Sequence, residues 1–309
     1  MAANFEIKRR LHMKAVDLFS GCGGLSLGFQ NAGFDVLAAF DWWQSAVQCY
    51  KANFSHPVFH MDLSDTAAAI AEIKKLNPDV IIGSPPCQDF SSAGKRVEND
   101  RAKLTVCYAK IVAGVRPAAF CMENVDRAKN SNAYMEARSI FHDCGYGLTE
   151  AVLDASLCGV PQKRKRFFCV GMLNKTDGFA LDAILSRLAK EPMTVRDYFG
   201  DSMGFEHYYR PPRNYNRRAI FSVDEPAPTM RGVNRPIPKG YKGNANDSVP
   251  VSDSVHALTT KDRALIQTFP TDFKWVGSKT DVEQMIGNAV PVNLAKFVGE
   301  ILKSFLEAN

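Results

Sequence analysis

The chain has 309 residues, a net charge of +5 and a hydrophobic fraction of 46%, values that are ordinary for a folded globular protein. This length allows one large domain or two modest ones, and the lack of a long apolar run or a secretory signal leads us to expect a cytoplasmic protein without membrane contact. The eight cysteines have neither CxxC nor CxxH spacing, so we expect reduced thiols and no metal site.

Strands and helices alternate along the first part of the chain. Short β-branched runs are followed by segments whose apolar residues recur at helical spacing, as Ala67, Ile70 and Ile73 do. This alternation predicts a doubly wound, mainly parallel, Rossmann-like α/β sheet. The predicted strands span residues 14–19, 34–40, 57–60, 80–82, 118–122, 148–153 and 167–170, and the predicted helices span residues 25–31, 64–76, 101–115, 135–144 and 179–188.

The pattern changes after residue 188. Pro, Gly, Asn, Arg and Tyr become frequent, and residues 207–242 carry eight Arg or Lys against two acidic residues. We therefore expect a small, irregular, β-rich domain with a basic face at residues 189–281, beside a large domain of residues 1–188 that residues 282–309 complete. Two further helices are predicted at residues 260–268 and 291–306. A basic face permits a nucleic-acid partner.

A glycine-rich turn, residues 21–24, follows the first predicted strand and allows a ligand to approach the backbone at a helix N-terminus. Asp41 lies at the end of the next strand, where a carboxylate suits the hydroxyls of a ribose. Trp42 beside it can cover an adenine ring, and Asp62 can accept a hydrogen bond from the adenine amino group. These residues indicate an adenosine-containing cofactor, although close helix–strand packing also explains the glycines. The turn lacks Gly-x-Gly-x-x-Gly, which argues against a dinucleotide.

A stiff turn follows the predicted strand Val80–Ile82. Gly83, Pro85 and Pro86 break the strand and restrict the backbone, so that Cys87 is presented on a rigid loop. This arrangement suits a nucleophile at the carboxyl edge of a parallel sheet. The alternative is a buried structural cysteine beside a turn.

Glu123 follows the strand predicted at 118–122 and should share a sheet edge with Cys87. A thiol and a carboxyl group that face one cleft suit covalent attack on an electron-poor ring, with proton donation to a ring nitrogen. The alternative for Glu123 is a solvated or helix-capping carboxylate.

The basic run at residues 162–166 opens another predicted strand. Alternation places Gln162, Arg164 and Arg166 on one side and Lys163 and Lys165 on the other. One face could enter an active site while the other meets phosphate. The alternatives are a nuclear-import signal and a solvated basic patch.

Six segments, in this order, resemble the motifs of cytosine-C5 DNA methyltransferases of the bacterial restriction–modification type. The resemblance spans nearly the whole chain, and one departure is the sequence Arg-Ala-Lys-Leu at 101–104, where the family often has Arg-Gly-Thr-Leu. The matching segments are DLFSGCGGL (17–25), GSPPCQ (83–88), ENV (123–125), QKRKR (162–166), residues 258–270 with QTFP at 267–270, and residues 284–291 with GNAVP at 287–291.

The resemblance implies a covalent mechanism at a cytosine of duplex DNA. Cys87 would add to C6, so that C5 becomes nucleophilic, and Glu123 would protonate or hydrogen-bond N3. Asn124 would orient the loop, and Arg164 and Arg166 would hold the base edge and O2. A base, expected to be water, would then remove the C5 proton before Cys87 leaves.

The implied cofactor is S-adenosylmethionine, with S-adenosylhomocysteine as product. Phe19 would offer an aromatic face to the sulfonium group. The residues that the resemblance assigns to this cofactor are Phe19, Ser20, Gly21, Gly23, Gly24, Leu25, Asp41, Trp42, Asp62, Leu63, Pro85, Leu104, Asn288 and Ala289.

The target base must be flipped out of the duplex, with residues 88–103 as a closing lid. We expect a monomer, associated with the nucleoid, whose segment 190–257 recognises DNA. An RNA-directed enzyme of the same fold, a catalytically silent binding homologue and a nicotinamide oxidoreductase are the alternatives. The resemblance and the basic segment together assign DNA contacts to Gln88, Ser91, Gln162, Arg217, Arg218, Thr229 and Arg231.

Overall fold

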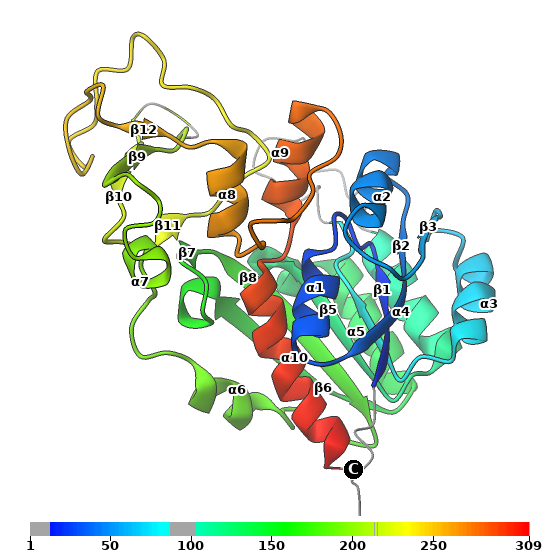
Figure 1. Ribbon diagram of the computed structural model, residues 1–309. Helices are drawn as coiled ribbons and strands as arrows, with labels where there is room; N and C mark the ends of the chain where they lie inside the picture. The colour runs from blue at the N-terminus through cyan, green and yellow to red at the C-terminus, as the bar shows by residue number, and fades with distance from the viewer. Residues whose placement is uncertain (1–12, 87–102, 213, 215, 309) are drawn as a thin grey trace, which may run out of the picture.

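The computed structural model describes residues 13–86, 103–212, 214 and 216–308 (Figure 1). A seven-stranded sheet forms the centre of its larger part. The strands of this sheet are β1 (Lys14–Leu18), β2 (Asp35–Asp41), β3 (Val58–His60), β4 (Val80–Gly83), β5 (Ala119–Val125), β6 (Tyr146–Asp154) and β8 (Lys165–Leu173). They lie in the order β3-β2-β1-β4-β5-β8-β6, and the buried, apolar sequences of β1, β4 and β5 fit a sheet that is covered on both faces.

Helices cover both faces of the sheet. One layer consists of α1 (Gly24–Asn31), α6 (Leu181–Arg187) and α10 (Val292–Glu307), which share an apolar cluster with one face of the strands. The other layer consists of α3 (Thr66–Leu76), α4 (Lys103–Val115) and α5 (Asn132–Asp143). Gly28 allows α10 to lie close against α1, because a Cβ atom at this position would come within 2.3 Å of the Ala295 Cβ. The predicted doubly wound α/β fold is confirmed.

Strand β8 differs from the expected parallel arrangement. It lies between β5 and β6 and runs antiparallel to both. This arrangement is possible because a short connection, and not a crossover helix, follows β6. The connection consists of a 3-10 helix (Ala155–Leu157) and the two-residue strand β7 (Gln162–Lys163), which leads directly into β8. As a result, the beginning of β8 lies beside the end of β5.

The region after α6 is irregular, as predicted. It contains α7 (Val195–Phe199), a three-stranded sheet of β9 (His207–Tyr209), β10 (Ile220–Ser222) and β12 (His256–Ala257), and the strand β11 (Ala227–Pro228), which pairs with β7. Apolar side chains such as Tyr208, Val223 and Met230 form its own core. In Figure 1 this region, in yellow and orange, lies above and to one side of the large sheet.

Helices α8 (Thr260–Ile266) and α9 (Lys279–Asn288) connect this region to the large sheet. Phe269 and Phe273 pack with Cys22 of the turn after β1 and with Ala46 of α2 (Gln44–Lys51), so part of the segment predicted for the small domain is buried against the large one. The helices α2, α7 and α9 were absent from the sequence-based prediction. Helix α7 carries a capping box of Thr194 and Asp197 that marks its start.

Candidate active site

The glycine turn after β1 is fixed to the end of β2 by one carboxylate. Asp41 Oδ2 accepts a hydrogen bond from the Gly21 amide at 2.8 Å, and its Oδ1 accepts one from the Trp43 amide at 2.7 Å. Phe19 and Gly23 adopt left-handed backbone conformations with φ of 57° and 98°. Burial raises the pKa of Asp41, although the two amides oppose this shift. Asp41 thus positions the turn at the place predicted for a ribose.

The surroundings of this turn fit an adenosine-containing cofactor. The Trp42 side chain is 62% exposed, so its indole face is available for a ring. Apart from its neighbours in the chain, no atom of the described residues lies within 4 Å of the position of a Cβ on Gly21, which leaves open space against the backbone. The Ser20 hydroxyl is buried and has no hydrogen-bond partner among the described residues. Asp62 is exposed at the carboxyl edge of the sheet, and its Oδ1 accepts the Ser64 amide at 2.9 Å.

Several predicted cofactor residues have packing roles. Leu63, which was predicted to bind the cofactor, has its side chain buried in the apolar cluster beneath α3 and α4. Leu25 is buried against α10. A Cβ on Gly23 would come within 2.4 Å of the Phe54 ring, and one on Gly24 would come within 2.4 Å of the Val290 carbonyl. The glycines therefore allow close packing, the alternative considered for them.

Three more predicted cofactor residues lie on other elements of the same part of the molecule. Leu104 is half-buried in the first turn of α4. Asn288 is exposed at the end of α9, where its Oδ1 accepts a hydrogen bond from Gln284 Nε2 at 2.9 Å. Ala289 follows it and is half-buried.

Asn124 holds the turn that precedes the predicted nucleophile. Its Nδ2 donates to the Pro85 carbonyl at 3.1 Å, and its Oδ1 accepts the Val125 amide at 2.8 Å. Asn124 is buried at the end of β5, so the end of β4 and the end of β5 are joined by a side chain. This contact agrees with the loop-orienting role predicted for Asn124. Cys87, Gln88 and Ser91 lie outside the described residues, as does the predicted lid from 88 to 102.

Glu123 and Arg166 form a buried ion pair at this edge of the sheet. Arg166 Nε lies 2.9 Å from Glu123 Oε1, and the Glu123 side chain is 6% exposed. Burial raises the pKa of Glu123, and the neighbouring Arg166 and Arg164 oppose the shift. The pair forms because β8 is antiparallel to β5, which places Arg166 opposite Val125. A protonatable carboxyl group therefore lies next to the turn that leads to Cys87.

Arg164 is placed differently from the prediction that it holds the base edge. Its side chain is fully buried, and it donates to the Met230 carbonyl at 2.9 Å. It also donates to the Gly287 and Ala289 carbonyls at 2.8 and 3.0 Å. Two of these acceptors lie at the end of α9 and one lies beside β11. Arg164 therefore joins the backbone after β11 to the end of α9, because its guanidinium donates to carbonyls of both.

Gln162, which was predicted to contact DNA, is likewise internal in this structure. It is fully buried; its Nε2 donates to Gln267 Oε1 at 2.8 Å, and its Oε1 accepts the Met230 amide at 2.9 Å. The predicted alternation along residues 162–166 is confirmed, because Lys163 and Lys165 are exposed while Gln162 and Arg164 are buried. Sequence alternation identified the inward face, but not what that face contacts.

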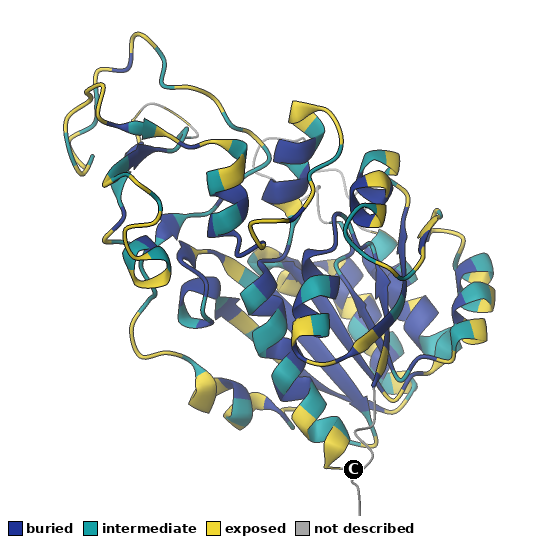
Figure 2. Ribbon diagram, in the orientation of Figure 1, coloured by how far each residue is buried: buried dark blue, intermediate teal, exposed yellow. Residues whose placement is uncertain are grey.

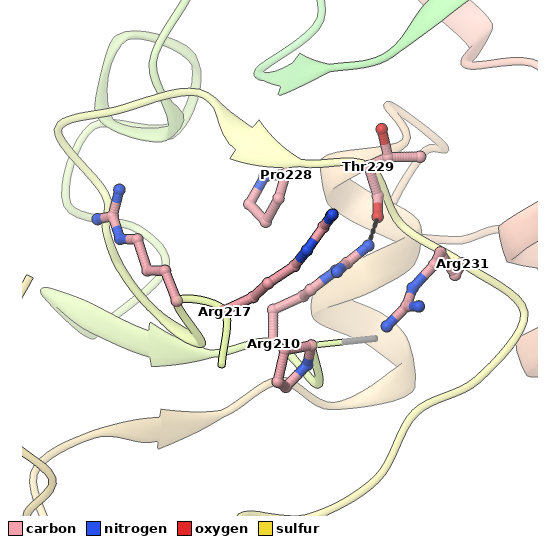
Figure 3. A pocket seen from close by; sticks show the side chains of 7 residues that line it. Arg210, Arg217, Pro228, Thr229 and Arg231 are labelled. Atoms are coloured by element: carbon pink, nitrogen blue, oxygen red, sulfur yellow. Dashed lines mark hydrogen bonds between the residues drawn. The ribbon is translucent and has the colours of Figure 1, made fainter. Parts of the chain in front are cut away.

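A hollow of about 340 Å³ lies between β11 and the loop that precedes β10. Figure 3 shows the Arg210 side chain extending to the segment that carries Thr229, while the Arg231 side chain extends from that same segment toward Arg210. Arg210 is absent from the residues predicted to bind DNA, although the density of arginine in its stretch was a signal. The residues that line this arginine hollow are Arg210, Pro212, Arg217, Arg218, Pro228, Thr229 and Arg231.

Arg218 is part of the wall of the arginine hollow. Its Nη1 donates to Glu225 Oε2 at 2.7 Å, and its Nη2 contacts the other oxygen of Glu225. Its Nε donates to the Ile220 carbonyl at 3.0 Å, and its guanidinium lies 4.4 Å from the centre of the Phe221 ring. These contacts use the donors that were predicted to bind DNA, so the structure gives Arg218 a supporting role.

Comparison with known proteins agrees with this site. The family model described as C-5 cytosine-specific DNA methylase matches residues 13–216 and 205–304. The chain therefore belongs to the C-5 cytosine-specific DNA methylase family and is a DNA cytosine-C5 methyltransferase, which confirms the resemblance found in its motifs. Membership implies DNA as the substrate and S-adenosylmethionine as the methyl donor.

The relatives include type II methyltransferases. The chain is 57% identical over 295 residues to M.HindV of Haemophilus influenzae, covering 95% of this chain and 97% of that protein. It is 55% identical to M.HgiDI of Herpetosiphon aurantiacus, covering 95% of each chain. The crystal structure of S. pombe Dnmt2 methyltransferase has a TM-score of 0.68 at 19% identity, covering 96% of this chain and 98% of that one. This last likeness concerns the fold alone.

Among the described residues, no helix is long and apolar enough to cross a membrane. Within the same ranges, no three His, Cys, Asp or Glu side chains are grouped as metal ligands would be.

Proposed function

We propose that this methyltransferase modifies a target cytosine of duplex DNA through a covalent bond between Cys87 and C6. The thiolate adds to C6, and the displaced electron density accumulates at N3, where Glu123 provides a proton. S-adenosylmethionine supplies the electrophilic methyl group to C5. Water then removes the C5 proton, the electrons of that bond re-form the C5–C6 double bond, and Cys87 leaves as a thiolate. The proton on N3 returns to Glu123, which restores the neutral base and the general acid.

The observation that carries this proposal is the buried Glu123–Arg166 pair beside the Asn124–Pro85 contact. A carboxyl group whose pKa is raised by burial can retain a proton and deliver it to a ring nitrogen. Arg166 keeps this carboxyl oriented and adds a positive charge near the base. Asn124 holds the turn two residues before Cys87. The contacts of Glu123, Asn124 and Arg166 thus support their predicted roles beside the turn that precedes Cys87 in the chain.

For the cofactor, we assign the ribose to Asp41, the adenine ring to Trp42 and Leu104, and the adenine amino group to Asp62. Phe19 faces the sulfonium group in this assignment, and the backbone of Ser20 and Gly21 borders the amino-acid part. The exposed indole of Trp42 and the open space at Gly21 support it. The product is S-adenosylhomocysteine.

The biological role follows from the relatives. M.HindV and M.HgiDI are type II methyltransferases, and their similarity extends over 95% of this chain. We therefore assign to it a sequence-specific modification of bacterial DNA that protects against a restriction enzyme. The enzyme acts as a monomer on DNA of the nucleoid, in the cytoplasm, because one flipped base requires one active site.

The test is methyl transfer from labelled S-adenosylmethionine to duplex DNA and, in parallel, to bulk tRNA. Wild-type protein should label DNA as 5-methylcytosine, and Cys87→Ser should abolish the label. Glu123→Gln should reduce the rate by about 10²- to 10⁴-fold, because an amide cannot donate the proton. Glu136→Gln is the matched control, since Glu136 is exposed on α5, whereas Glu123 is buried. Label in tRNA alone, or an active Cys87→Ser variant, would contradict the proposal.

A further inference from the structure

The arginine hollow contains two kinds of arginine. Arg210 Nη1 donates to the Pro211 carbonyl at 3.3 Å, and its Nη2 donates to the Thr229 carbonyl. Arg231 Nη2 donates to the same Pro211 carbonyl. Two guanidinium groups from different loops are therefore held on one backbone oxygen. Arg217, by contrast, is exposed, and among the described residues no side-chain contact fixes its guanidinium.

This difference in anchoring separates two uses of arginine on DNA. A phosphate attracts any nearby cation, so an exposed and freely rotating side chain is sufficient. A base edge has to be met in a defined plane, and guanine presents the acceptors N7 and O6 side by side in the major groove. A guanidinium that is already oriented loses less conformational freedom when it forms two parallel hydrogen bonds. Arg210 and Arg231 have this property, and Arg217 does not.

The hollow is also connected rigidly to the catalytic edge. Met230, between Thr229 and Arg231, has its carbonyl bound by Arg164 and its amide bound by Gln162. The Arg231 carbonyl accepts a hydrogen bond from buried Arg263. Two residues after Arg164 in the chain, Arg166 pairs with Glu123. A base that is read by the hollow would therefore lie at a fixed number of base pairs from the target cytosine.

We propose that Arg231, supported by Arg210, reads the major-groove edge of a guanine at a fixed position in the recognised sequence, while Arg217 contacts a backbone phosphate. This inference rests on the proposed function and adds to it one base of the recognised sequence and the residues that read it. The wall of the hollow, with Arg218 bound to Glu225, keeps the reading pair in place.

The experiment compares Arg231→Lys with Arg217→Ala on a library of duplexes whose bases around a cytosine are randomised. Methylation is read by bisulfite sequencing. Arg231→Lys keeps the charge but loses the planar fork, so preference for guanine at one position should fall by about 5- to 150-fold. Arg217→Ala should leave every base preference unchanged, weaken binding of all duplexes alike, and reduce the slope of log affinity against log salt by about one.

Two results would overturn the inference. One is an Arg231→Lys variant that loses activity equally on all sequences, as a phosphate contact would. The other is an Arg231→Lys variant that keeps every guanine preference of the wild type. If Arg231→Lys does not fold, Arg210→Lys takes its place. Because Arg210 supports Arg231, this variant should lose guanine preference at the same position of the recognised sequence. Failure of the proposed function itself is distinct, since wild-type protein would then leave the whole library unmethylated.

Discussion

The seven-stranded sheet and the recognition segment, residues 227–234, are stabilised by different kinds of contact. The sheet is held between helices by two apolar clusters, in which side chains such as Phe29, Ile82 and Phe120 are fully buried. Figure 2 shows the strands of this sheet mostly in the colour of buried residues. Residues 227–234 also contribute Ala227 and Met230 to an apolar cluster, but their backbone is bound in addition by buried polar side chains of other elements. Arg164 and Arg263 reach the carbonyls of residues 230 and 231 in this way.

This difference has a consequence for how the two regions can change. An apolar core restricts the size and shape of the side chains that compose it. Side chains such as Arg164 and Arg263, which bind backbone carbonyls, restrict the path of the backbone of residues 227–234. They do not restrict which side chains that backbone carries. Residues 227–234 can therefore exchange their outward-facing side chains while their position relative to Glu123 is maintained. If these residues read DNA as proposed, such exchanges would change the recognised sequence.

The largest effect is expected when a polar anchor is broken. Arg263 forms a buried ion pair with Glu283, which also accepts a hydrogen bond from the Thr260 hydroxyl at 2.7 Å. Arg263→Met leaves the carboxylate of Glu283 buried without its cation, so the free energy of unfolding should fall by about 3–5 kcal/mol, as measured by urea titration. The double variant Arg263→Met, Glu283→Gln should recover part of this loss. A loss below about 1 kcal/mol in the single variant would show that this anchor is dispensable.

A smaller effect is expected from a polar group inside the apolar region. Asp17 is fully buried in β1, and burial raises its pKa from 3.8 to about 8, although the Ser26 hydroxyl donates to it at 2.6 Å. Because the unfolded carboxyl ionises first, the stability associated with the folded, protonated form is lost as the pH rises from 4 toward 8. Between pH 7 and pH 8 this loss amounts to about 1 kcal/mol.

The variant Asp17→Asn has no such proton to lose. Its free energy of unfolding should therefore rise relative to that of the wild type as the pH increases from 4 toward 8. Urea titration of both proteins at several pH values measures this change. Parallel pH profiles for the two proteins would contradict the assignment to Asp17.

The smallest effect is expected for an ion pair on the surface of the sheet region. Arg187 of α6 lies 3.1 Å from Glu300 of α10, and both side chains are well exposed. Water screens this pair, so Arg187→Ala should reduce the free energy of unfolding by less than about 1 kcal/mol. Arg187–Glu300 and Arg263–Glu283 are both Arg–Glu pairs, but the first is exposed and the second is buried. Comparing Arg187→Ala with Arg263→Met therefore tests the effect of burial. Equal losses in the two variants would remove the distinction drawn between the two regions.

The large sheet could be predicted from sequence because its signals are local. Runs such as Val80–Ile82 and the glycine turn at 21–24 specify a strand or a turn by themselves, and the structure has β4 and the start of α1 there. Asp41 and Glu123 were found because strand ends of a parallel sheet meet at one edge. To identify these two residues, it was sufficient to know the order of strands and helices along the chain.

The rest depends on contacts between distant parts of the chain. Nothing near Arg164 in sequence indicates that its guanidinium binds carbonyls at 230, 287 and 289. The same holds for Gln162 and its partner Gln267. Helix α9 was missed because its ten residues contain several polar side chains, and its capping Ser278 is a weak signal alone. The direction of β8 could not be obtained from periodicity, which is the same in parallel and antiparallel strands.

The antiparallel course of β8 also determines where the gene can tolerate insertions and deletions. Successive side chains of a strand point to opposite faces, so removing one residue from β8 would turn every later side chain to the wrong side. The pairing of β8 with β5 on one edge and β6 on the other means that such a slip would disturb both neighbours. Length changes among descendants of this sequence should therefore gather in the stretch between α6 and α8 and be absent between residues 165 and 173.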